Sequence, residues 1–321
     1  GYFQPRVTEE DSESSNDFEM MERPAITDAV RKIAAGDARF SFGAMHYEKR
    51  WWIAAYFTGQ SFNNRSGLTS GSGIVNSQTG GTFRAAGRPY MSKDIDVHVG
   101  VSAISAFKTA ATCATNSNAA CARSFSFGQS PEVNLTTTNL ATAAVANASS
   151  VWAAGPELGF RWKNLLLKGE YYHIGVTRGD MANAPQGTVN LEGYYGSANY
   201  TLFGKGRMYN EKEGAFGAPG VEHEFDPQHG YWGALELTGR YSVTDFHDVA
   251  ITGVSSGAGV NNGTQQTVWS GGLNWYPNRH FRVMLDFNHF MVTGNGNTSA
   301  AIINENGRTG NSLAARVQAA F

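Results

Sequence analysis

The chain has 321 residues, a formal net charge of −2 and 16% charged residues. This charged share lies below the roughly 25% of ordinary soluble domains, and the near-neutral balance excludes a globally basic nucleic-acid-binding protein. The sequence holds no run of about 18 apolar residues, so we expect no transmembrane helix. The mean hydropathy of −0.33 still fits a membrane β-barrel, because polar lumen-facing residues offset the lipid-facing ones.

The start of the chain differs from the rest. Gly1–Arg6 is expected to end a strand, whereas Val7–Ala35 is polar, acidic and partly helical, with Pro24 interrupting the helix. No signal peptide precedes Gly1, so we expect an exported protein in mature or truncated form.

From Ala38 onward, apolar and polar residues alternate in segments of about 10 residues, the length and period of strands that cross an outer membrane. With Gly1–Arg6 as the first, we predict about twelve strands and an all-β, antiparallel transmembrane β-barrel. The other predicted strands are Ala38–Tyr47, Lys49–Gln60, Thr82–Met91, Asp94–Phe107, Val151–Trp162, Leu165–Thr177, Val189–Phe203, Tyr231–Val243, Gln265–Trp275, Phe281–Val292 and Asn311–Phe321.

The clearest hairpin covers Gln265–Val292. Trp269, Leu273 and Trp275 alternate with polar or small residues, and the same period continues after the turn chemistry of Tyr276–His280. Aromatic residues gather at strand ends, as they do at membrane interfaces, although a carbohydrate-stacking path is an alternative function for them.

The connections between strands form two classes. Tight turns near residues 48, 93, 164 and 278 alternate with long loops at 61–80, 108–148, 178–187, 244–264 and 294–310. Short turns at one end and long loops at the other are typical of transmembrane barrels. Residues 204–230 do not fit, because their place in the alternation calls for a short turn. They form either a longer periplasmic loop or an extra hairpin.

Two cysteines, Cys113 and Cys121, lie close together among small residues in the 108–148 loop. This spacing favours a local disulfide and an oxidising compartment, and two free surface thiols are the alternative.

Three patterns resemble the phosphate-selective porin O and P family of outer-membrane channels. They are GYFQPR with SSNDFEMMERPAITDAV, then GYYGSANYTLFGKGRMY with GAFG and GALELTGRYSVTDFHD, and finally GGLNWYPNRHFRVMLDFNHFMV with the terminal Phe321. The resemblance implies a sixteen-stranded barrel in the Gram-negative outer membrane, assembled as a homotrimer in contact with the lipid bilayer and lipopolysaccharide. It also implies passive diffusion of small anions, phosphate or polyphosphate among them.

Counting strands back from Phe321 places residues 7–37 as the third outer loop, which folds into the pore and narrows it in this family. Four N-terminal strands would then be absent from this sequence, and an independent twelve-stranded barrel is the alternative. The same resemblance makes Arg23, in the MERP stretch, the candidate constriction residue, with Arg31 and Lys32 behind it.

Alternation along the strands also predicts the charged residues that line the pore. The anions are Asp94, Asp96, Glu157, Glu170, Glu236 and Asp286, and the cations are Arg39, Arg50, Arg84, Arg88, Arg161, Lys168, Arg240, Arg282 and Arg316. Arginine suits transient phosphate binding because its planar guanidinium donates paired hydrogen bonds to oxyanions. Arg84 and Arg88 could form two rungs of such a path, or could instead pair with Asp94 and Asp96.

The acidic residues of segment 7–37 oppose anion passage unless they are paired or face outward. A general or cation-preferring porin, a Ca²⁺-binding loop and a mainly structural barrel are therefore alternatives. His98, His173 and His289 are scattered, and no serine lies in a nucleophile motif, so we predict no catalytic site. No cofactor, metal site or nucleic-acid partner is predicted. The sequence favours an outer-membrane porin for small anions.

Overall fold

A computed structural model describes residues 30, 33–34, 39–61, 75–76, 78–112, 122–129, 141–179, 186–246, 264–294 and 308–319. The predicted strand end at Gly1–Arg6, the acidic residues of segment 7–37 and both cysteines lie outside these residues. No described helix is long and apolar enough to cross a membrane.

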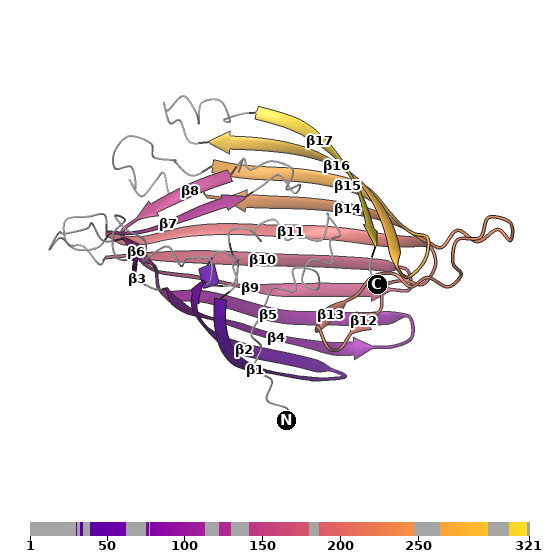
Figure 1. The fold of residues 1–321 in the computed structure, drawn as a ribbon, viewed down its shortest axis with the longest axis horizontal. Helices are drawn as coiled ribbons and strands as arrows, with labels where there is room; N and C mark the ends of the chain where they lie inside the picture. The colour runs from indigo at the N-terminus through magenta and orange to yellow at the C-terminus, as the bar shows by residue number, and fades with distance from the viewer. Residues whose placement is uncertain are drawn as a thin grey trace.

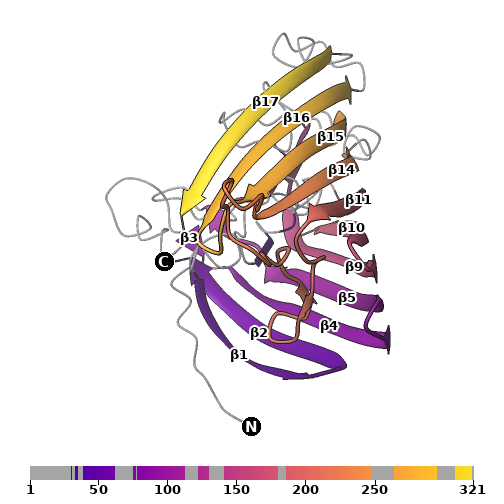
Figure 2. The same ribbon diagram turned by 90° about the vertical axis from the view of Figure 1, so that its right-hand side faces the viewer.

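The main element is an antiparallel sheet of 11 strands, in which each strand pairs with its neighbours in chain order. Figures 1 and 2 show that the sheet is strongly curved, with one concave face. The all-β, antiparallel prediction is confirmed, and in the described residues the first and last strands are not paired with each other. The strands are β1 (Arg39–Glu48), β2 (Trp51–Ser61), β4 (Thr79–Met91), β5 (Ile95–Lys108), β9 (Ala148–Trp162), β10 (Leu165–Arg178), β11 (Gly187–Phe203), β14 (Ala234–Asp245), β15 (Thr264–Tyr276), β16 (Phe281–Gly294) and β17 (Arg308–Ala319).

Exposure alternates along the strands as a membrane-spanning sheet requires. Large apolar side chains such as Leu158 and Phe287 are exposed, whereas their neighbours Glu157, Asp286 and Asn288 on the concave face are buried. A soluble protein would bury such residues, but lipid solvates them on the outer wall of a barrel. We call the concave surface the inner face and the opposite surface the outer face.

The short turns all lie at one end of the sheet, which we call the turn end; the opposite end is the loop end. They fall at residues 49–50, 163–164 and 277–280, and at Ser92, whose hydroxyl accepts from the Ile95 amide at 2.9 Å. Lys163 adopts a φ of 53°, which a tight turn between β9 and β10 requires. These turns agree with the predicted positions.

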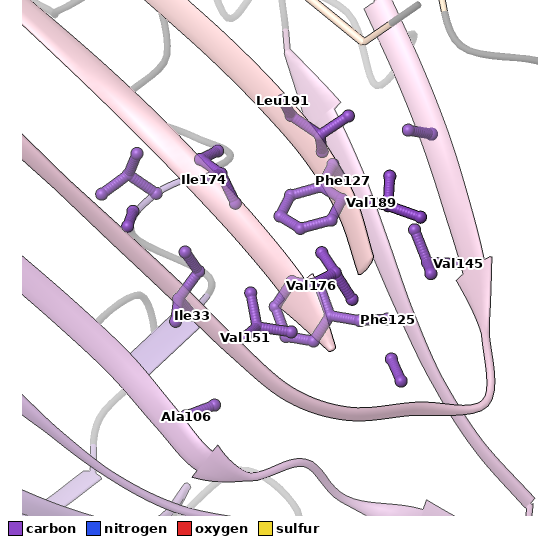
Figure 3. Packing of buried hydrophobic residues seen from close by; sticks show 14 of the residues in the cluster. Ile33, Ala106, Phe125, Phe127, Val145, Val151, Ile174, Val176, Val189 and Leu191 are labelled. Carbon is purple, nitrogen blue, oxygen red and sulfur yellow. The ribbon is translucent and has the colours of Figure 1, made fainter. Parts of the chain in front are cut away.

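At the loop end, the inner face is mainly apolar, and other segments of the chain cover it. The strands β7 (Ala122–Gln129) and β8 (Ala141–Ala146) pair within a small four-stranded sheet that also contains β3 (Val75–Asn76) and β6 (Ala111–Thr112). Phe125, Phe127 and Val145 from this hairpin join a buried cluster with inward-facing residues of β5, β9, β10 and β11 (Figure 3). The predicted 108–148 loop therefore contains strands.

The helical residues Val30, Ile33 and Ala34 belong to the same cluster. The side chain of Gln78 donates a hydrogen bond to the Ile33 carbonyl, and Ala34 lies beside Gly80. These three described residues of segment 7–37 thus lie against the inner face.

At the turn end, residues 204–230 resolve the two alternatives in favour of an extra hairpin. The short strands β12 (Tyr209–Asn210) and β13 (Ala215–Phe216) pair with each other, and Figure 2 places them on the concave side of the sheet. We call residues 205–220 the inner hairpin. Strand β14 begins at Ala234, so the predicted start at Tyr231 was wrong: Tyr231 bridges Asp226 in a turn before the strand.

The fold depends on close approach of β9 and β10 at Gly155. A Cβ atom on Gly155 would lie 1.6 Å from the Tyr171 carbonyl oxygen, which is backbone and cannot give way. Gly155→Ala should therefore destabilise the folded sheet by roughly 1–3 kcal/mol and lower the folded fraction in a heat-modifiability gel. Gly271→Ala is the control, because nothing lies within 4 Å of its added carbon. Equal folded fractions for the two variants would contradict this close packing.

Candidate pore-lining site

The inner hairpin is fixed to the sheet by a buried ion pair. Arg207 donates two hydrogen bonds to Glu236 on β14, Nε to Oε2 at 2.7 Å and Nη2 to Oε1 at 2.7 Å. Their side chains are 1% and 0% exposed, and Asn274 donates a third bond to Glu236 at 3.1 Å. This two-pronged geometry satisfies both charges in a dry site, so the base of the hairpin is held firmly.

Arg84 on β4 holds the tip of the same hairpin. Its Nε lies 3.0 and 3.1 Å from the two Glu157 oxygens, while Nη1 and Nη2 donate to the carbonyls of Glu213 and Gly214 at 2.8 Å each. Arg84 pairs with Glu157 on β9, and not with Asp94 or Asp96. One guanidinium therefore joins two strands and the hairpin tip.

Arg88, four residues after Arg84 on the inner face of β4, forms a buried ion pair with Asp96 on β5. It also donates to the Lys49 carbonyl at 3.0 Å, and its guanidinium lies 4.3 Å from the centre of the Tyr209 ring. Glu211 approaches at 3.6 Å. Arg88 is thus a second anchor between the wall and the inner hairpin.

Aromatic and histidine side chains complete this contact. His98 shares hydrogen bonds of 3.0 Å with both Tyr209 and Glu157, and Tyr209 packs edge-on against Phe216 at 5.2 Å. Burial raises the pKa of Tyr209 to about 12, against the opposing charges of Arg84 and Arg88. The Tyr209 hydroxyl therefore stays protonated at neutral pH and keeps its bond to His98.

Arg161 on β9 differs from the arginines at the hairpin. It is 3% exposed, and its Nη1 and Nη2 donate at 3.4 and 3.3 Å to the carbonyls of Lys163 and Lys93 in two tight turns. Among the described residues, no carboxylate forms an ion pair with it, and its Nε has no hydrogen-bond partner. Its positive charge is held in place by backbone dipoles.

The remaining predicted cations lie further around the wall. Lys168 on β10 and Arg316 on β17 are half-buried on the inner face. Arg240 stacks over Tyr195 at 4.5 Å, and Arg282 donates to the Tyr276 hydroxyl at 3.3 Å and to Gln318 at 3.0 Å. These four cations come from β10, β14, β16 and β17, whereas the arginines that contact the tip and the Tyr209 ring of the inner hairpin, Arg84 and Arg88, come from β4.

The other predicted site residues are not brought into this arrangement. Arg50 is exposed in the turn between β1 and β2, where its carbonyl accepts from the Arg88 amide at 2.8 Å. The side chain of Arg39 lies outside the described residues, as do Arg23, Arg31 and the cysteine pair. Their roles stay predictions.

Two inner-face residues stand out in the structure beyond these. Arg178, absent from the predicted set, is 7% exposed at the loop end of β10, with no hydrogen-bond partner on Nε or Nη1. The predicted strand stopped at Thr177, and one more step of its alternation would have placed Arg178 inward. Asp286 is 1% exposed, and neither carboxylate oxygen has a partner.

The Arg207–Glu236 pair predicts the behaviour of the inner hairpin. Arg207→Gln should leave Glu236 buried without its counter-charge, at a cost of roughly 3–5 kcal/mol, which is enough to release the hairpin base. We expect a larger single-channel conductance in planar bilayers. Lys212→Gln removes the same charge from an exposed position in the same hairpin and should keep the wild-type conductance. An unchanged conductance in both variants would mean that the hairpin does not narrow the pore.

Comparison with known proteins agrees with this geometry. The family model described as "Phosphate-selective porin O and P" matches residues 1–321, which is the whole chain. A comparison with curated proteins gives no match. The long strands with an apolar outer face, the charged inner face and the full-length match together show that the chain belongs to the phosphate-selective porin O and P family.

Proposed function

We propose that this porin conducts small anions by passive diffusion across the Gram-negative outer membrane, with phosphate or polyphosphate as the favoured solute. The family supports a channel of this class. Assembly as a homotrimer in contact with lipopolysaccharide belongs to the same proposal, and family membership is its support.

The observation that carries the anion preference is the distribution of carboxylates on the inner face. Asp96, Glu157 and Glu236 are each bound by an arginine, namely Arg88, Arg84 and Arg207. Paired charges contribute little net field to the lumen, so these three carboxylates do not repel passing anions strongly.

The inner-face cations that are not paired with Asp96, Glu157 or Glu236 then set the sign of the field. Arg161 has no carboxylate partner among the described residues, and Lys168, Arg240, Arg282 and Arg316 lie on the inner face of β10, β14, β16 and β17. On these four strands the inner-face carboxylates are Glu170, Glu236 and Asp286, of which Glu236 is held by Arg207. A positive balance in a narrowed lumen attracts anions, and several moderate sites in series allow them to leave again.

The covered inner face favours a second candidate, a mainly structural barrel. The β7–β8 hairpin lies against the loop end and the inner hairpin against the turn end, so the lumen is narrowed from both sides. A blocked barrel would pass almost no current, whereas a diffusion channel would pass a steady one.

The first test is the reversal potential of the reconstituted protein under a KCl gradient, followed by addition of phosphate. We expect a chloride-favouring potential and a chloride current that low concentrations of phosphate reduce. A potential near zero or favouring potassium would refute the anion preference, and absence of current would favour the structural barrel.

The half-buried cations provide a more specific test. Lys168→Gln with Arg316→Gln should shift the reversal potential toward zero, because two positive charges leave the inner face. Lys93→Gln with Lys212→Gln is the control, since both of these lysines are exposed at the turn end. Equal shifts in the two double variants would show that total charge, and not its place on the wall, controls selectivity.

The constriction role of Arg23 is tested in the same way. Arg23→Ala should weaken the anion preference, because it removes the cation that the family pattern places at the narrowest point. The reversal potential and the phosphate block measure this change. Unchanged selectivity would remove Arg23 from the mechanism.

A further inference from the structure

We propose that a pocket at the turn end binds a small phosphorylated organic anion, of the size of a sugar phosphate. The cavity measures about 410 Å³ and lies between the base of the inner hairpin and the β15–β16 turn. We call it the turn-end pocket. This inference deepens the proposed function and rests on it in one respect, since the ligand would reach the pocket through the lumen.

The charge of the lining points to an anion. Lys205 comes from the hairpin base, Arg279 and His280 from the turn, and Arg282 from the start of β16. No lining residue carries a carboxylate, and all of them are among the described residues. Glu222 lies outside the pocket and approaches Lys205 only at 3.9 Å, with both side chains well exposed. An exposed pair of this kind competes weakly with a bound anion.

Hydrogen bonds to the backbone and one buried side chain fix the frame of the pocket. Lys205 and Gly220 exchange two backbone hydrogen bonds of 2.8 and 2.9 Å, which closes the hairpin base. The Asn278 side-chain oxygen accepts hydrogen bonds from the backbone amides of His280 and Phe281 at 2.9 Å each, which shapes the turn. Arg282 is 7% exposed and held by Gln318 at 3.0 Å. A backbone frame that is already in place loses little entropy when the ligand binds.

Size and apolar lining distinguish the ligand from inorganic phosphate. A volume of 410 Å³ equals that of roughly fourteen waters at about 30 Å³ each, which is far more than one phosphate group fills. It also lies in the range of roughly 300–1,000 Å³ that small organic ligands occupy. Pro219, Val221 and Phe281 add apolar surface beside the cations. This mixture fits a phosphate group attached to a carbon skeleton.

The position of the pocket gives it a role in passage. Its residues come from the turn end, where the inner hairpin and the β15–β16 turn lie close together (Figure 1). Arg282 and Gln318 face the lumen on β16 and β17. An organic phosphate that has passed the inner hairpin would therefore meet this pocket before it leaves the channel.

The test compares three solutes on the full-length protein in planar bilayers under symmetrical KCl. Glucose 6-phosphate should reduce the current at a severalfold lower concentration than orthophosphate, and glucose should have no effect. Lys205→Gln with Arg279→Gln should abolish most of the difference between the two phosphates. Lys93→Gln with Lys212→Gln removes equal charge from the turn end outside the pocket and should preserve it.

Isothermal titration of the detergent-solubilised protein with glucose 6-phosphate decides the question if the channel carries no current. We expect binding to the wild type that the Lys205/Arg279 double variant loses and the control variant retains. Equal block by the two phosphates, an unchanged difference in the pocket variant, or no heat of binding would overturn the proposal. The reversal potential reports separately on the proposed anion preference, so a cation-preferring channel with an intact pocket is recognised as such.

Discussion

The structure depends first on the absence of water in the hydrocarbon layer. Each backbone N–H and C=O at that depth must find a partner within the protein, and an unpaired group costs several kcal/mol. The eleven strands pair in chain order, each antiparallel to its neighbours, which meets this demand everywhere except at the outer edges of β1 and β17 among the described residues. Once the hydrogen-bonded ladder between the strands is continuous, the direction of each side chain is fixed. Alternate residues face lipid, and the residues between them face the lumen.

The inner face consequently does not have to be apolar along its whole length, and it is divided into two zones. At the loop end, aliphatic residues such as Ile174 and Val189 are covered by Phe125 and Phe127 of the β7–β8 hairpin. At the turn end, charged residues are covered by the inner hairpin. Aliphatic residues need no polar partner, whereas a buried ion is costly unless a counter-ion or backbone carbonyls bind it. The two-pronged Arg207–Glu236 pair meets this requirement.

Much of the main sheet was predictable because the sequence pattern that specifies a strand is local. A period of two over about 10 residues, bounded by Gly, Pro and Asn, identifies a strand without any knowledge of its neighbours. Phe281, Leu285 and Phe287 on β16 illustrate this, since their exposure follows directly from the alternation. The short turns were predictable for the same reason.

The inner hairpin was not predictable in this way. Its strands β12 and β13 have two residues each, too few to show any period. What holds them is tertiary contact with residues far away in the chain, such as Arg84, His98 and Glu236. The true start of β14 was missed because Tyr231 is in step with the alternation of Leu235, Leu237 and Tyr241, although it is paired with Asp226 in a turn. A segment fixed by distant partners carries little local signal.

The pairing of Arg84 and Arg88 changes how the wall can work. An arginine that passes a phosphate along a pore must have hydrogen-bond donors to offer, but Arg84 gives its three nitrogens to Glu157, Glu213 and Gly214. Arg88 is likewise occupied by Asp96 and the Lys49 carbonyl. A solute would have to displace the inner hairpin to reach these donors. The two arginines are therefore occupied as anchors of the inner hairpin, and in the proposed function the inner-face cations on β10, β14, β16 and β17 attract the anions. On this proposal, pore width and pore charge are controlled by different residues.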